Sequence, residues 1–84
     1  MKPMDVSLEQ KLRGDPNAHV RLIIRTAAKP AQYRTALEQQ GLRVLRVSTL
    51  INAVTVEGLA KSALALRDKD WVAAIEDDRP VHTM

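Results

Sequence analysis

The stretch that decides the fold is VRLIIRT, residues 20–26, in which apolar and charged side chains alternate. Alternation with a period of two is typical of a β-strand, because successive side chains point to opposite faces of the sheet. One face would carry Val20, Leu22 and Ile24, and the other would carry Arg21, Ile23 and Arg25. We therefore predict a first strand with one face in the core.

The residues that follow predict a helix and a pair of strands. Pro30 suits the first turn of a helix, Tyr33 and Leu37 lie on its inner side, and Gly41 supplies a C-terminal stop. Residues 42–50 predict a strand whose interspersed arginines suggest a sheet edge and leave its register open. After a break at residues 51–52, the β-branched residues 53–57 predict a third strand that pairs with the second and closes at Gly58.

The remaining pattern completes a recognisable order of elements. Residues 59–67 have helical spacing, and residues 72–76 predict a final strand. Strand, helix, strand, strand, helix, strand is the order of the ferredoxin-like α+β fold, in which a four-stranded antiparallel sheet has both helices on one face. We expect this domain in residues 18–78.

Two segments are expected outside that domain. Residues 1–17 are predicted to be a leader, partly helical or disordered, with Ser7 as a helix cap and Leu8 and Leu12 one turn apart. Residues 79–84 are predicted to be an extended tail, because Pro80 opposes a helix. At roughly 3.3 Å per residue, the last four residues reach about 13 Å, enough to occupy a row of pockets in a partner's cleft.

The sheet face without helices is a candidate binding surface. Two helices cover only one side of such a sheet, so the other side meets water or a partner. We expect this open side to be small or apolar more often than charged, with Ile23, Ala53, Thr55, Ala73 and Ile75 upon it. An apolar patch of that kind is more often a binding surface than a solvated one.

Composition argues against metal, nucleic acid and membrane as partners. The chain of 84 residues has no cysteine, and His19 and His82 lie far apart without a further metal ligand beside them, so we expect no metal and no other cofactor. The net charge of +3 is scattered, and Tyr33 and Trp71 are the only aromatic residues, so the stacking platforms of single-stranded nucleic-acid binders are missing. We find no apolar run long enough for a membrane span and no hydrophobic centre of a signal peptide.

An enzyme is also not expected. Ser7, Ser48 and Ser62 have no histidine and carboxylate near them in the sequence, and no stretch matches a phosphate-binding loop or a pair of catalytic acids. The sequence pattern therefore favours a protein that binds a partner.

Two stretches of the chain resemble the propeptides of subtilisin-like serine proteases and their free inhibitor relatives. They are NAVTVEGL, residues 52–59, and WVAAIEDD, residues 71–78, and the likeness extends over residues 20–84. The last strand of that family typically reads Val-Ala-Tyr-Val-Glu-x-Asp, which corresponds here to Val72, Ala73, Ala74, Ile75, Glu76 and Asp78. The chain departs from the family at Trp71, where a small or acidic residue is more usual, and at Pro80 within the tail.

The resemblance implies a way of binding. The open sheet face would pack on two parallel surface helices of the protease, and Glu76 and Asp78 would cap the N-termini of those helices. The tail would lie in the substrate groove as a product-like strand, formed by Val81, His82, Thr83 and Met84. Met84 would fill the primary specificity pocket, because a long, flexible, apolar side chain suits such a pocket.

The resemblance also implies what the chain does for its protease. It would be a transient inhibitor and an intramolecular folding chaperone, and it would be a monomer when free. A propeptide would be secreted or periplasmic, whereas a free inhibitor would be cytoplasmic.

Other functions of the fold remain open at this stage. A ferredoxin-like domain can bind small ligands or RNA, or can dimerise through its open sheet face, because the fold does not choose among functions. Sedimentation of the isolated chain would distinguish a dimerisation module from a protein that binds a protease, because a tight dimer would bury the face that a protease needs.

Overall fold

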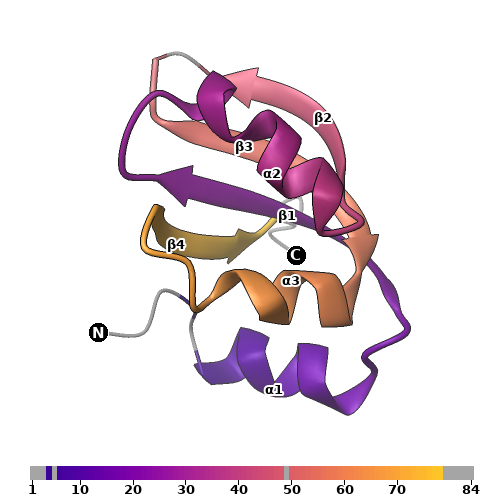
Figure 1. Cartoon of the computed structure of the whole chain (residues 1–84). Helices are drawn as coiled ribbons and strands as arrows, with labels where there is room; N and C mark the ends of the chain where they lie inside the picture. Colours follow the sequence, from indigo (N-terminus) through magenta and orange to yellow (C-terminus); the bar gives the residue numbers. More distant parts are fainter. Residues whose placement is uncertain (1–3, 5, 49, 79–84) are drawn as a thin grey trace, which may run out of the picture.

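The protein is described by a computed structural model that covers Met4 and residues 6–48 and 50–78. Its elements, in chain order, are α1 (Val6–Gly14), β1 (His19–Thr26), the 3-10 turn η1 (Pro30–Tyr33), α2 (Arg34–Gln39), β2 (Arg43–Ser48), β3 (Ala53–Leu59), α3 (Ala60–Leu66) and β4 (Val72–Asp77) (Figure 1). The strands form one sheet in the order β2-β3-β1-β4, and all neighbouring strands are antiparallel. The predicted ferredoxin-like α+β fold is confirmed.

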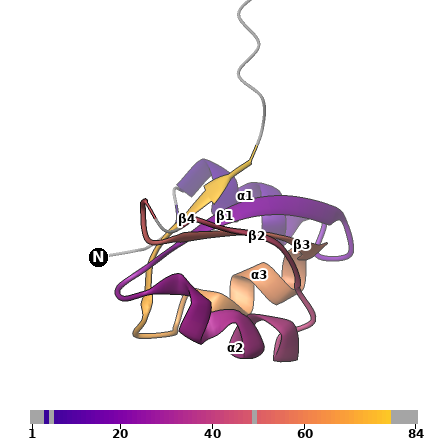
Figure 2. The same ribbon diagram turned by 90° about the horizontal axis from the view of Figure 1, so that it is seen from above.

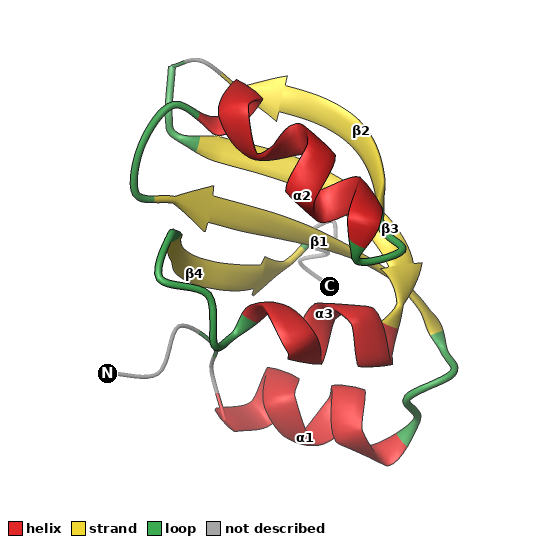
Figure 3. Ribbon diagram, in the orientation of Figure 1, coloured by secondary structure: helices red, strands yellow, loops and turns green. Residues whose placement is uncertain are grey.

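One face of the sheet is covered by helices. Figures 1 and 2 show α2 and α3 on the same side of the strands, and Figure 3 distinguishes the helices from the strands by colour. Leu22 and Ile24 of β1 are fully buried on this side, as the alternation of residues 20–26 predicted. They meet the buried Leu37 of α2 and Leu66 of α3 in a single core. The helix-covered face therefore carries the stability of the domain.

Two glycines have different structural roles. Gly41 has φ of +89°, a conformation that side-chain-bearing residues rarely adopt, so it ends α2 as the sequence predicted. Gly58 was expected to close a strand, but it lies inside β3. A Cβ at Gly58 would come within 2.9 Å of Leu42 Cδ2 and 3.1 Å of the Gly41 carbonyl oxygen. Gly58 thus allows the connection between α2 and β2 to approach β3 closely.

The N-terminal helix packs into the domain. Leu8 and Leu12 of α1 are buried in the same core as the strands, and α1 lies against α3. Glu9 of α1 and Arg67, which follows α3, form an ion pair of 2.7 Å. Residues 1–17 were expected to be a leader outside the domain, because the spacing of two leucines does not show what they contact. The helix begins at Val6, so Ser7 lies within its first turn.

Candidate functional site

The sheet face opposite α2 and α3 consists of three rows of cross-strand neighbours, and we call it the open face. Residues that pair directly across antiparallel strands share a face of the sheet. From β2 towards β4 the rows are Arg43, Glu57 and Arg21; Arg46, Thr55, Ile23 and Glu76; and Ser48, Ala53, Arg25 and Ala74. Asp78 extends the first row, because its backbone N–H donates a hydrogen bond of 3.1 Å to the Arg21 carbonyl oxygen.

The open face is charged, which corrects the sequence-based expectation of a small and apolar surface. Four of the side chains in these rows are arginines and two are glutamates, whereas the large apolar residues are Ile23 near the centre and, outside the paired rows, the exposed Leu45 at the bulge of β2. Arg21 and Arg25 were already placed away from the core by the alternation of β1. The two arginines of β2 were missed, because the register of that strand was left open. A partner of this face must therefore match charges as well as shape.

Glu76 and Asp78, the two carboxylates expected to cap partner helices, lie at the C-terminal end of β4. Glu76 lies opposite Ile23 on the open face, and its Oε2 accepts a hydrogen bond of 2.7 Å from Arg25 Nε. The two side chains are 46% and 44% exposed, so the pair is open to water. Asp78 is partly exposed and lies two residues after Glu76, directly after the end of β4. Both carboxylates are therefore placed at the end of β4 from which the chain continues into residues 79–84.

The intervening residue, Asp77, faces the other way. It pairs with Leu22 in the register of the sheet, and its carboxylate forms an ion pair of 3.2 Å with Lys11 of α1. Strand alternation thus separates the acidic triplet into two carboxylates for the open face and one that contacts α1.

Ile75 is not on the open face, so this part of the sequence prediction is wrong. It is 2% exposed and lies opposite Ile24 in the core. The cause is an irregularity in β4: Val72 pairs with Thr26 and Ala74 with Arg25, which leaves Ala73 as an extra residue. A bulge of this kind reverses the alternation on one side of it, so Val72 and Ile75 both face inwards. Ala73 is exposed at the bulge.

The other predicted face residues are found on the expected side. Ile23 and Thr55 lie opposite each other in the middle row and are partly exposed. Ala53 lies in the third row but is only 3% exposed, so its neighbours cover it. The tail residues Val81, His82, Thr83 and Met84 lie outside the described residues.

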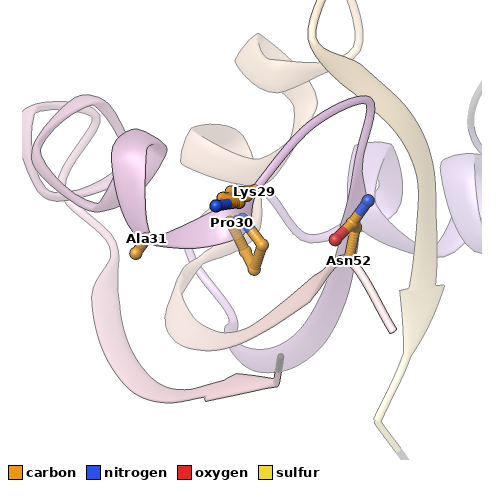
Figure 4. A pocket seen from close by; sticks show the side chains of 4 residues that line it. All are labelled: Lys29, Pro30, Ala31 and Asn52. Atoms are coloured by element: carbon orange, nitrogen blue, oxygen red, sulfur yellow. The ribbon is translucent and has the colours of Figure 1, made fainter. Parts of the chain in front are cut away.

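A small cavity lies beside the start of η1. It has a volume of about 290 Å³, and its described lining consists of Lys29, Pro30, Ala31 and Asn52, which come from the start of η1 and the turn before β3 (Figure 4). These residues provide one amine and one amide, and neither a carboxylate nor an imidazole. Among the described lining residues, Lys29 is the one titratable group.

Within residues 4, 6–48 and 50–78, no group of three or more His, Cys, Asp or Glu side chains is arranged to hold a metal ion. None of the helices in this part of the chain is long and apolar enough to cross a membrane.

No protein-family model matches this chain, and no curated protein is similar enough in sequence to count as a match.

Proposed function

We propose that this chain is a propeptide or propeptide-like inhibitor of a subtilisin-like serine protease. The observation that carries the proposal is the position of Glu76 and Asp78 on the helix-free side of the sheet, at the end of the last strand and directly before the tail. The resemblance in residues 71–78 implies that these two carboxylates would contact the protease.

The first step of binding would be made by the carboxylates. The first N–H groups of a helix have no partner within the helix, and the helix dipole adds positive charge at the same end. Glu76 uses Oε2 for Arg25, and within the described part of the chain its Oε1 accepts no hydrogen bond. One carboxylate oxygen of Glu76 is thus open to accept N–H groups from a partner helix, and the partly exposed Asp78 would serve a second helix in the same way.

The second step would be made by the tail. Once the sheet is docked, residues 79–84 continue from β4 into the substrate groove, where backbone pairing gives affinity and side chains such as Met84 give specificity. The chain would act as its own product and occupy the active site without supplying any catalytic group.

The chaperone role would follow from the same contacts. A surface that binds only the folded protease stabilises it by mass action, and it also favours late folding intermediates in which the same surface has formed. Inhibition and assisted folding would therefore share one interface.

The test is an inhibition assay with a subtilisin and a chromogenic peptide substrate. The intact chain is compared with a version that ends at Pro80 and with Glu76→Gln. We expect the intact chain to inhibit, the shortened chain to lose most of that inhibition, and Glu76→Gln to weaken it. Equal inhibition by the intact and shortened chains would refute the role of the tail, and inhibition by neither would refute the proposed function.

A further inference from the structure

The charges of the open face are separated across the sheet. Arg43 and Arg46 lie on β2 at one edge, whereas Glu76 and Asp78 lie on or directly after β4 at the other. Neighbouring strands are about 4.8 Å apart, so the three spacings from β2 to β4 place these two groups roughly 14 Å from each other. The face therefore has a cationic edge and an anionic edge.

The cationic edge is exposed and only partly neutralised. The Arg43 side chain is 79% exposed, and its Nη1 lies 3.6 Å from the carboxylate of Glu57, a long ion pair. Arg46 is exposed and has no ion-pair partner among the described residues. Both arginines point to the same face although they are three positions apart, because the register shifts between Val44 and Arg46. The bulge thus gathers two cations on one side of an edge strand.

We infer that the protease surface which receives this face carries acidic side chains opposite Arg43 and Arg46, about 14 Å from the helix N-termini that Glu76 and Asp78 cap. This inference rests on the proposed function and adds a specificity element to it. The cationic edge selects among proteases, while the carboxylates and the tail contact features that such proteases share. Charges arranged in this way favour a complementary partner and disfavour a partner of the wrong sign.

Charge arrangement also argues against nucleic acid as the occupant. The open face carries no aromatic side chain among its described residues, so bases have nothing to stack on. Glu57 and Glu76 lie in the same rows as the arginines and would repel a phosphate backbone. An acidic protein surface meets the arginines without placing a continuous line of negative charge over the glutamates.

The experiment compares two forms of one protease. The first is a subtilisin, and the second is the same enzyme with Asp and Glu introduced at exposed positions of the two surface helices that receive the sheet. Inhibition constants are measured at low and high salt for the intact chain and for Arg43→Gln/Arg46→Gln. The matched control is Arg34→Gln/Lys61→Gln, which removes the same charge from exposed positions on α2 and α3.

We expect the intact chain to inhibit the acidic protease about tenfold more tightly than the parent at low salt, because charge complementarity acts on docking and is screened by ions. The gain should disappear in Arg43→Gln/Arg46→Gln and persist in the control. Circular dichroism spectra should be the same for all three proteins, since the substituted side chains are exposed.

Several outcomes would overturn the inference. If the chain inhibits both proteases equally, the inference about Arg43 and Arg46 is refuted but the proposed function is not. If the chain inhibits neither protease, the inference and the proposed function are both refuted. Sedimentation of the chain alone as a dimer that Arg43→Gln/Arg46→Gln dissociates would assign the cationic edge to a second copy. Tight, salt-dependent binding of a single-stranded oligonucleotide that the same variant abolishes would assign it to nucleic acid.

Discussion

The substitution Glu76→Gln separates the role of this carboxylate in binding from any role in stability. In the free chain Glu76 pairs with Arg25 at 2.7 Å, but both side chains are nearly half exposed. Ion pairs open to water contribute about 0.2–1 kcal/mol, so the free energy of unfolding should fall by no more than that. Glutamine keeps the size of the side chain and removes its charge, and thus leaves the packing of the open face unchanged.

The expected effect on binding is larger. In the complex the carboxylate would accept hydrogen bonds from helix N–H groups away from bulk water, and hydrogen bonds to charged groups contribute about 1.5–3 kcal/mol. Since 1.4 kcal/mol corresponds to a factor of ten, the inhibition constant should rise about 10- to 100-fold. The expected loss of binding free energy is therefore larger than the expected loss in the free energy of unfolding.

The assay combines inhibition kinetics with urea unfolding. Trp71 is the only tryptophan and stacks on Tyr33 with 4.5 Å between the ring centroids, so its fluorescence reports loss of the folded state. Asp77→Asn is the control, because Asp77 is the next residue and contacts Lys11 on the other side of the strand. An unchanged inhibition constant for Glu76→Gln, or an equal rise for Asp77→Asn, would refute the reasoning.

Three further predictions concern the core, a close backbone approach and the tail. Leu12→Ala should lower the free energy of unfolding by about 2–5 kcal/mol in urea denaturation, because Leu12 is fully buried. Leu50→Ala, at a side chain that is 97% exposed, should change it by less than about 0.5 kcal/mol, and equal effects would contradict the placement of α1 in the core. Gly58→Ala should cost about 1–3 kcal/mol in the same measurement, since its Cβ would meet Leu42 at 2.9 Å, and a neutral result would show that the neighbouring segment yields freely. Met84→Asp should weaken protease inhibition by more than about 2 kcal/mol, because it would place a charge in an apolar pocket; an unchanged inhibition constant would show that Met84 is not bound there.

The fold could be predicted from the sequence because each central element carries a strong local signal. In β1 the apolar residues recur at every second position, and the structure places Leu22 and Ile24 in the core. Gly41 has a positive φ at the end of α2. Glycine adopts such a φ more readily than any other residue, so the helix end can be predicted from this one residue type. Signals of this kind depend only on neighbours along the chain.

The open face could be predicted only in part, because two register shifts decide it. In β4 the extra residue falls at Ala73 within a pair of alanines, so no change of residue type reveals the bulge, and Ile75 was assigned to the wrong face. In β2 the shift brings Arg43 and Arg46 to the same face, whereas strict alternation would separate them. A bulge depends on how two strands pair, and the sequence of one strand alone does not show which residues of the neighbouring strand it pairs with.

The packing of α1 bears on how the proposed site is maintained. A domain of this size rarely gains more than about 3–5 kcal/mol from its core, and burying one leucine contributes about 1.5–3 kcal/mol before the cost of ordering the helix is subtracted. The contribution of Leu8 and Leu12 is therefore comparable with the stability of the whole domain. Because α1 contacts α3, and Leu8 and Leu12 lie in the same core as Val72 and Ile75, the helix supports the strand that carries Glu76. In the proposed function, α1 would therefore let the chain present a formed docking face before it meets a protease.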